Sequence, residues 1–175
     1  MNQSVLQAII QKGHWEEGHW EDGVMLSVDP PETAFGYTYH AHMIPPLCPK
    51  DMLLLGSGKV LGNSTVQKLI EKVFGKIESV VEIDLQNGID AKSYVEESRD
   101  KFDYIAVDLW CGSRMCDFVK DKNFASKLFE MCNGFICLNV PYSCIKTIAN
   151  VYTEAGFNYD RFDQVEGNGI IWFSK

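Results

Sequence analysis

From residue 50 onward, short apolar runs alternate with segments of helical periodicity, and this alternation limits the possible folds more than any other feature of the chain. The apolar runs and helical segments follow one another in the order 52–55, 64–74, 79–83, 90–99, 104–109, 123–132 and 135–140. Parallel strands need long crossover connections, which are usually helices, so this order is typical of βαβ units. We therefore predict an α/β fold with a mostly parallel, Rossmann-like sheet and helices on both faces.

The C-terminal segment predicts a change in strand direction. A helical pattern over 143–155 ends at Gly156, and two strand-like segments, 159–165 and 170–173, flank a glycine-rich turn at 166–169. Strands joined by such a short turn form antiparallel hairpins. We expect this antiparallel C-terminal hairpin to close the sheet.

Prolines mark a boundary before the first apolar run. Pro45, Pro46 and Pro49 lie just ahead of residue 50. Proline and the residue that precedes it both disfavour a continuing helix or strand. We therefore assign residues 1–49 to an N-terminal extension and residues 50–175 to the Rossmann-like domain.

The extension contains two further patterns. Apolar residues over 1–11 recur at helical spacing, which predicts a short amphipathic helix whose exposed apolar face would suit a homodimer. A glycine-bounded repeat at 13–23 and alternation over 24–28 predict a β-hairpin. Because His14 and His19 would point to opposite faces of an extended strand, we expect no metal site there.

The charge balance narrows the class of partner. The chain has 16 basic and 24 acidic residues, a net charge of −8 and a pI near 4.9. Binding to a phosphate backbone needs a basic face, so we expect no nucleic-acid partner.

The apolar runs fall far short of the roughly 20 residues that a membrane helix needs, so we expect no membrane partner. Residues 1–12 carry no secretory signal pattern. We expect a cytoplasmic protein that acts on a small molecule.

Six cysteines raise the question of disulfides or metal binding. Without a secretory signal, cysteines generally stay reduced, so we expect thiols at all six positions. These are Cys48, Cys111, Cys116, Cys132, Cys137 and Cys144. The pairs 111/116 and 132/137 are spaced more widely than the cysteines of most zinc motifs, so we expect no metal site.

The turn after the first apolar run carries the residues of a nucleoside site. Gly56-Ser57-Gly58 follows that run directly, and the acidic residues Glu82 and Asp84 end the next run, Glu82 lying 26 positions after Gly56. Glycines at the carboxyl end of a strand let the backbone approach a ligand, and an acid on the neighbouring strand can accept hydrogen bonds from a ribose. The sequence therefore predicts a nucleoside pocket.

Three other interpretations of this turn compete with the nucleoside pocket, and the residues depart from the first two. A phosphate-binding loop would place Ser or Thr after Lys59, where this chain has Val60. A dinucleotide fingerprint would place its third glycine three residues after Gly58, whereas Gly62 comes four residues later. The turn could also serve only to pack a helix against a strand, because glycine patterns alone are weakly specific.

The segment Asn139-Val140-Pro141-Tyr142 ends the last apolar run of the parallel part. It is similar to the Asn-Pro-Pro-Tyr motif of methyltransferases that act on exocyclic amines, but its second residue differs and it follows one strand too late. Proline readily ends a strand, so we interpret this segment as a strand-ending turn.

Five segments, in order along the chain, carry a resemblance to a known family. They are Tyr39-His40-Ala41-His42-Met43, residues 53–58, Val81-Glu82-Ile83-Asp84, Asp90-Ala91 and residues 102–109. From about residue 38 onward the chain resembles the spermidine synthase branch of the class I S-adenosylmethionine-dependent methyltransferase fold. The resemblance implies a transferase whose cofactor is S-adenosylmethionine or decarboxylated S-adenosylmethionine.

The resemblance also implies roles for individual residues. The cofactor would be held by residues of the glycine turn and of the strands that follow: Gly56, Ser57, Gly58, Gly62, Glu82, Asp84, Asp90, Ala91 and Leu109. Glu82 would accept the ribose hydroxyls, and Asp90 would meet the adenine amino group. Asp108 would orient and deprotonate the acceptor, with Tyr39 or His40 covering it. An ammonium group has no lone pair, so a base must take a proton before it attacks.

Two departures from the family pattern affect these expectations. Only six positions separate Asp84 from Asp90, where the full fold has a helix and a strand, so we expect a shortened sheet. Asp108 is followed by Leu109 and Trp110 rather than by a second acid, so the acceptor-site acids are incomplete. We therefore hold two hypotheses: a transferase that passes a methyl or aminopropyl group to a small nucleophile, and a non-catalytic nucleoside-binding or interaction protein that keeps the fold.

Overall fold

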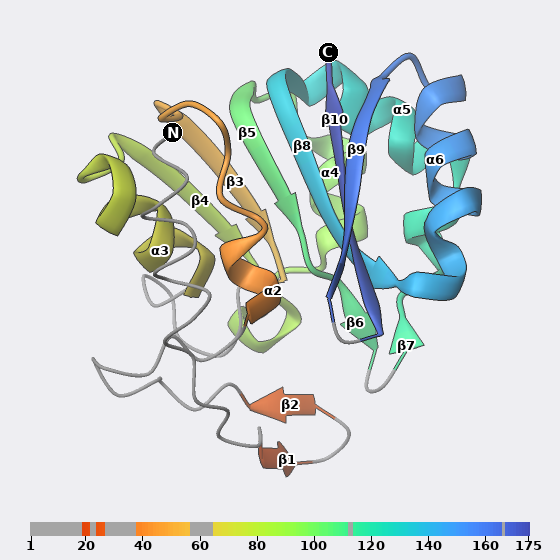
Figure 1. Cartoon of the computed structure of the whole chain (residues 1–175), viewed down its shortest axis with the longest axis horizontal. Coiled ribbons are helices and arrows are strands. Elements are labelled where there is room, and N and C mark those ends of the chain that lie inside the picture. Colours follow the sequence, from red (N-terminus) through yellow and green to blue (C-terminus); the bar gives the residue numbers. More distant parts are fainter. Residues whose placement is uncertain (1–18, 22–23, 27–37, 57–64, 112–113, 166) are drawn as a thin grey trace.

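A computed structural model describes residues 19–21, 24–26, 38–56, 65–111, 114–165 and 167–175. Within this part of the chain, a six-stranded sheet in the order β4-β3-β5-β8-β10-β9 forms the centre of the molecule (Figure 1). Helices cover both of its faces. The predicted α/β class and Rossmann-like sheet are confirmed.

The sheet has a parallel part and an antiparallel part. The parallel strands are β3 (Asp51–Leu55), β4 (Ser79–Ile83), β5 (Phe102–Val107) and β8 (Cys132–Pro141). The antiparallel strands are β9 (Asn158–Val165) and β10 (Asn168–Ser174), with β10 inserted between β8 and β9. The predicted C-terminal hairpin is therefore confirmed, and its tight turn includes Gly167 at φ 87°.

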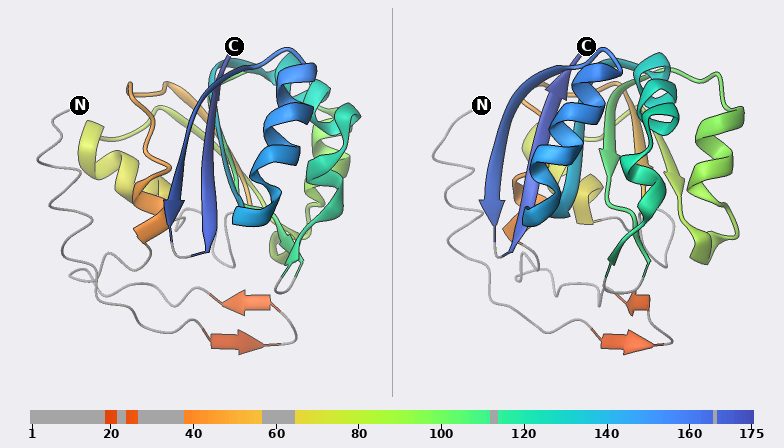
Figure 2. Two further views of the ribbon diagram at one scale, coloured as in Figure 1. Left: turned by 45° about the vertical axis from the view of Figure 1, so that its right-hand side comes forward. Right: turned by 90° about the vertical axis from the view of Figure 1, so that its right-hand side faces the viewer.

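The helices form two layers, one on each face of the sheet (Figure 2). One layer contains α4 (Ala91–Glu97), α5 (Lys122–Met131) and α6 (Ile145–Glu154). The other contains α2 (Thr38–Ala41) and α3 (Thr65–Phe74). Among the described residues, three short 3-10 helices connect these elements: η1 (Leu85–Asn87), η2 (Asp117–Lys120) and η3 (Tyr142–Cys144).

Two apolar cores separate the sheet from its two helix layers. On β3, Leu53 and Leu55 pack in the first core with the α4, α5 and α6 layer, whereas Met52 and Leu54 pack in the second core with α2 and α3. Successive side chains of a strand point to opposite faces, so a strand buried on both sides must be apolar throughout. This explains why β3 appears in the sequence as an unbroken apolar run.

The sheet is shortened at one edge, as the short spacing between Asp84 and Asp90 predicted. Only η1 and a turn connect β4 to α4, and β4 is an edge strand of the described sheet. Three backbone hydrogen bonds close this connection: Asn87 N and Ile89 N donate to Asp84 O, and Gly88 N donates to Leu85 O. The chain thus passes from β4 to the opposite helix layer within a few residues.

Part of the N-terminal extension lies within the described residues. The predicted hairpin is present as β1 (His19–Glu21) paired antiparallel with β2 (Val24–Leu26). The helix predicted over residues 1–11, and His14 with it, lie outside the described residues. Ala41, Met43 and Ile44 are buried in the second core, so the end of the extension packs as part of the main domain.

The prediction that every cysteine is a free thiol is wrong for one pair. Cys111 and Cys116 form a disulfide, with their Cα atoms 5.3 Å apart. The chain reverses between β6 (Trp110–Cys111) and β7 (Arg114–Met115), and this reversal brings the two Cα atoms within the range that a disulfide needs. The expectation from the cellular compartment alone did not include this local geometry. Cys48, Cys132, Cys137 and Cys144 are free thiols.

The described residues contain neither a metal-binding cluster nor a membrane-spanning helix. No cluster of three or more histidine, cysteine or acidic side chains there is arranged to hold a metal ion. In the same part of the chain, no helix has the length and apolar character to cross a membrane.

Candidate functional site

The carboxyl ends of the parallel strands meet at one edge of the sheet, the lower edge in Figure 1. The predicted residues Gly56, Glu82 and Asp108 lie there, at or just after the ends of β3, β4 and β5. Helix α2 and the β6–β7 hairpin border the same edge (Figure 1). Open α/β sheets bind their ligands at the carboxyl ends of the strands, so this edge is the candidate site.

Gly56 brings the end of β3 against the end of β5. Its φ is 86°, its N–H donates to Ile83 O at 2.8 Å, and a Cβ at this position would lie 2.1 Å from Asp108 O. No side chain fits there, and the left-handed conformation itself favours glycine. The sequence requires glycine here so that three strand ends can converge. The remaining predicted turn residues, Ser57, Gly58 and Gly62, lie outside the described residues.

The Asp108 carboxylate is held by side chains from three different segments. Its Oδ1 accepts hydrogen bonds from Trp110 Nε1 and Asn139 Nδ2, both at 2.8 Å. Its Oδ2 lies 3.2 Å from His40 Nε2. The Asp108 side chain is 16% exposed and that of His40 is 10% exposed. Indole and amide N–H groups can only donate, so Oδ1 is fixed as an acceptor while Oδ2 meets a group that can also carry a proton.

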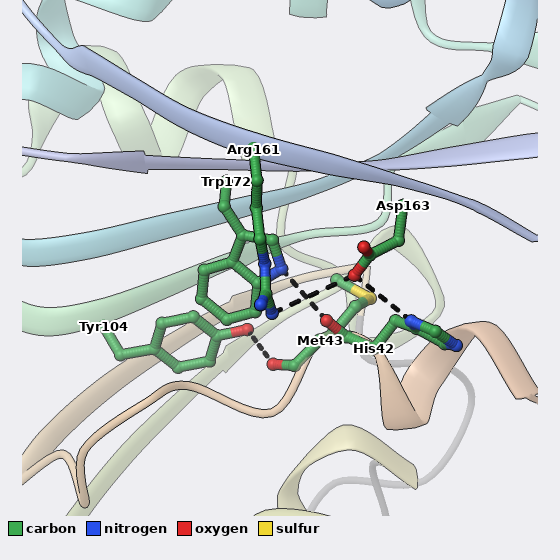
Figure 3. A network of polar contacts seen from close by, with 6 residues as sticks. All are labelled: His42, Met43, Tyr104, Arg161, Asp163 and Trp172. Carbon is green, nitrogen blue, oxygen red and sulfur yellow. Dashed lines mark hydrogen bonds and ion pairs between the residues drawn. The ribbon is translucent and has the colours of Figure 1, made fainter. Parts of the chain in front are cut away.

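Helix α2 lies over this carboxylate because the chain after it is bonded to the sheet (Figure 3). Tyr104 Oη donates to Met43 O, and Trp172 Nε1 donates to His42 O at 3.0 Å. The His42 ring Nδ1 lies 3.2 Å from Asp163 Oδ2 on β9. Burial raises the pKa of Tyr104, so its hydroxyl remains a hydrogen-bond donor.

Arg161 completes this attachment. Its guanidinium lies 5.6 Å from the centre of the Trp172 ring and 3.9 Å from Asp163 Oδ2 (Figure 3). Arg161 and Asp163 are alternate residues of β9, so their side chains lie on one face of the sheet. Residues 42–43 are therefore fixed to β5 and β10 by their backbone and to β9 by the His42 ring, and the placement of His40 follows from it.

Strand alternation places the acidic residues of the site on the α2 face of the sheet. Ala106 and Cys137 pack in the second core, so Asp108 and Asn139, two residues further along each strand, continue that face. Val80 packs against the same core, and Glu82 follows it on β4 by the same alternation. Because β3 lies between β4 and β5, the strands of Glu82 and Asp108 are about 10 Å apart, a distance suited to a nucleoside and its reacting group.

The other predicted cofactor residues have structural contacts of their own. Asp90 is the N-cap of α4, where Oδ2 accepts hydrogen bonds from Ser93 N and Ser93 Oγ, both at 2.8 Å. The hydrogen bonds from Ser93 hold the pKa of Asp90 below its ordinary value. Ala91 and Leu109 are buried in the first core. Tyr39 lies on α2, and its side chain lies outside the described part of the structure.

Sequence reasoning missed two residues of this cluster. Asn139 was interpreted as part of a strand-ending turn, and Trp110 as a departure from an acidic pattern, yet both donate to Asp108 Oδ1. Asn139 is 2% exposed, and its Oδ1 has no hydrogen-bond partner among the described residues. A polar residue at the carboxyl end of an otherwise apolar run was the available signal, since a buried amide needs partners.

Replacing Gly56 with alanine tests the close approach of β3 and β5. The Gly56→Ala variant should lose more than about 2 kcal/mol of unfolding free energy, because it combines a strained φ with a clash against backbone. Gly88→Ala is the matched control: its φ is 77°, but a Cβ there meets nothing within 4 Å. It should lose only about 1 kcal/mol. Equal losses in urea denaturation would contradict this account.

Replacing Asp90 tests its role as the N-cap of α4. Asp90→Ala should lose about 1 kcal/mol of unfolding free energy at neutral pH, whereas Asp90→Asn, also a good N-cap, should lose much less. The pKa of Asp90 is lowered on folding, so its charge stabilises the folded protein at pH values above its ordinary pKa of 3.8. This contribution is lost as the pH falls through the lowered pKa. Urea denaturation of the three proteins from pH 7 to pH 2 checks this. A difference between Asp90→Asn and the native chain that stays constant with pH would contradict it.

Comparison with known proteins identifies the fold. Neither a family model nor a curated protein matches the sequence. Among solved structures, the chain is similar to the ribosomal protein L11 methylase of Lactobacillus delbrueckii subsp. bulgaricus, with 16% identity, a TM-score of 0.57 and coverage of 80% of each chain. It is similar to a SAM-dependent methyltransferase of Archaeoglobus fulgidus, with 12% identity, a TM-score of 0.53 and coverage of 78% of this chain and 90% of that one.

A third similar structure is a spermidine synthase solved with the transition-state analogue AdoDATO. The identity is 13% and the TM-score 0.54, and the match covers 78% of this chain and 60% of that one. At these identities the likeness concerns the fold alone. The chain has the class I S-adenosylmethionine-dependent methyltransferase fold, as the sequence resemblance implied.

Proposed function

We propose that the chain binds S-adenosylmethionine or decarboxylated S-adenosylmethionine at the carboxyl edge of its sheet and transfers a methyl or aminopropyl group to a small nucleophile. The observation that carries the proposal is the approach of Gly56 to Asp108, where a Cβ would lie 2.1 Å from Asp108 O. It brings a residue without a side chain next to a carboxylate held by three side chains, at the edge where this fold class binds ligands.

The nucleoside half of the site would lie between β3 and β4. Gly56 directly follows β3 and has no side chain, which suits close packing of a ligand against its backbone. Glu82 lies one residue before the end of β4 on the face of α2, within reach of a ribose diol at that edge. Asp84 directly follows β4, and its backbone carbonyl accepts hydrogen bonds from Asn87 N and Ile89 N.

The acceptor half would lie around Asp108. When bound, the sulfonium cofactor supplies an alkyl carbon with a good leaving group. The residues of this chain then have two tasks: to orient the acceptor and to take up its proton. Trp110 and Asn139 fix Oδ1, so Asp108 presents a carboxylate of defined orientation. His40 contacts Oδ2 and covers it, which keeps bulk water from the carboxylate.

One observation favours the alternative, a non-catalytic protein that keeps the fold. In the described part of the chain, each Asp108 oxygen already has a partner, and the side chain is 16% exposed. A carboxylate bound in this way can have a purely structural role, because burying it without partners would be costly. A catalytic Asp108 requires that an acceptor replace or join the His40 contact.

Cofactor binding is tested by titration calorimetry with S-adenosylmethionine, decarboxylated S-adenosylmethionine and methylthioadenosine. Glu82→Gln should weaken the preferred ligand about 10- to 100-fold, because a hydrogen bond to a charged group contributes about 1.5–3 kcal/mol. The matched control is Glu78→Gln, an exposed glutamate just before β4 at the opposite edge of the sheet, which should bind like the native chain. Binding of none of the three ligands by the native chain would favour the non-catalytic alternative.

Catalysis is tested by Asp108→Asn. Release of S-adenosylhomocysteine or methylthioadenosine, measured with a panel of small amines, thiols and alcohols, should fall about 10²- to 10⁴-fold while cofactor affinity changes little. Asp121→Asn is the control, since Asp121 is exposed and its side chain makes no capping hydrogen bond. Undiminished turnover by Asp108→Asn would rule out its role as a base.

A further inference from the structure

A disulfide lies beside the candidate site, in a chain whose other cysteines are thiols. Cys111 and Cys116 are joined across the β6–β7 hairpin, which begins two residues after Asp108. The four remaining cysteines, Cys48, Cys132, Cys137 and Cys144, carry no disulfide. The single bridge is therefore at the edge of the sheet where the predicted site residues gather.

The two sulfurs of the bridge differ in their surroundings. Cys111 is exposed, whereas Cys116 is 7% exposed and belongs to the first core together with Met115 and Val119. A thiolate in solution can therefore reach the Cys111 sulfur, and the Cys116 sulfur is the leaving group. Among the free thiols, burial raises the pKa of Cys132 to about 11, which makes it a poor partner for exchange.

The bridge is connected to Asp108 by a short and well-defined path. Trp110, adjacent to Cys111 on β6, donates its indole N–H to Asp108 Oδ1 at 2.8 Å. At the other side of the hairpin, Cys116 N donates to Leu109 O at 3.1 Å. The disulfide thus closes the loop from residue 111 to residue 116. Trp110 lies next to this loop on β6, and Met115 on β7 anchors the loop in the first core. Opening the bridge removes the covalent constraint on Trp110.

We propose that Cys111–Cys116 is a thiol–disulfide exchange site for dithiol reductants, and that its oxidation state sets how firmly Trp110 holds Asp108. In the forward direction, one thiolate of the dithiol attacks the Cys111 sulfur, the bond between the two cysteine sulfurs breaks, and the Cys116 thiolate takes a proton. The second thiol of the reductant then displaces Cys111 from the mixed disulfide. The reductant leaves as its own disulfide, and the two electrons it loses reduce the bridge to two thiols.

The effect on activity rests on the proposed function, but the exchange site itself does not. In the oxidised chain, Oδ1 of Asp108 has two donors, Trp110 and Asn139, and the carboxylate is fixed. In the reduced chain, Trp110 is held only by non-covalent contacts, and Asp108 keeps Asn139 and His40 as partners. Turnover, where it occurs, should therefore be lower in the reduced chain.

The test uses the full chain with dithiothreitol as the probe. Titration of thiols after denaturation should give four per chain before reduction and six after it, as the chain has six cysteines of which four are free. In a ¹⁵N–¹H spectrum, the indole signal that disappears in Trp110→Phe should shift on reduction, while that of Trp172, bonded to His42 O away from the hairpin, should stay. The Cys111→Ser variant should reproduce the reduced position of the Trp110 signal without dithiothreitol.

Two results would overturn the proposal. Six thiols before reduction would show that the bridge does not form in solution. An unmoved Trp110 signal after full reduction would show that the bridge has no hold on Asp108. A Cys48→Ser variant controls for the exposed thiol elsewhere on the chain: it should give three thiols before reduction and five after it, with the same shift of the Trp110 signal as the native protein. Thiol counts and indole signals are read without any cofactor, so failure of the proposed function leaves both readouts intact.

Discussion

The Asp108 carboxylate is the constraint on which the rest of the structure depends. It lies at the carboxyl end of the central strand β5, largely shielded from water, and an unpartnered charge there would cost several kcal/mol. Its partners come from α2, β6 and β8, segments far apart in the sequence. Satisfying one charge therefore requires that the N-terminal extension, the hairpin and the parallel sheet assemble in a single arrangement.

The same arrangement explains where the site lies. Both faces of β3 and β5 are filled by apolar side chains, so charged groups on these strands lie at or near their ends. At the carboxyl ends, the convergence at Gly56 brings three strands together, and the attachment of residues 42–43 to Tyr104 and Trp172 lays α2 across them. The short connection after β4 leaves that strand at the edge of the described sheet.

The sequence predicted the backbone better than the side-chain cluster. The apolar runs predicted β3 and β5 because strands buried on both faces need no polar alternation, and they also predicted β8 and the partly buried edge strand β4. The glycine turn was predicted for the approach of a ligand, and the close contact of Gly56 with Asp108 O is a further reason for glycine there. The contacts of Asp108 could not be predicted, because they join residues 40, 110 and 139 only once the sheet has formed. The disulfide could not be predicted for a similar reason: it depends on the β6–β7 hairpin, whose strands are too short to show a periodic pattern in the sequence. Asp90 has two explanations, a ligand contact or the capping of α4, and its acceptance of the Ser93 N–H supports capping.

The central claim is that the carboxyl edge, around Gly56, Glu82 and Asp108, holds a nucleoside with a sulfur-bearing tail. The most direct measurement is a ¹⁵N–¹H spectrum of the backbone amides during titration with S-adenosylhomocysteine. The account predicts that the largest shifts fall at these three residues and that the amino ends of the strands, at Asp51, Ser79 and Phe102, stay unchanged. Shifts confined to the amino ends, or none at all at millimolar ligand, would contradict it.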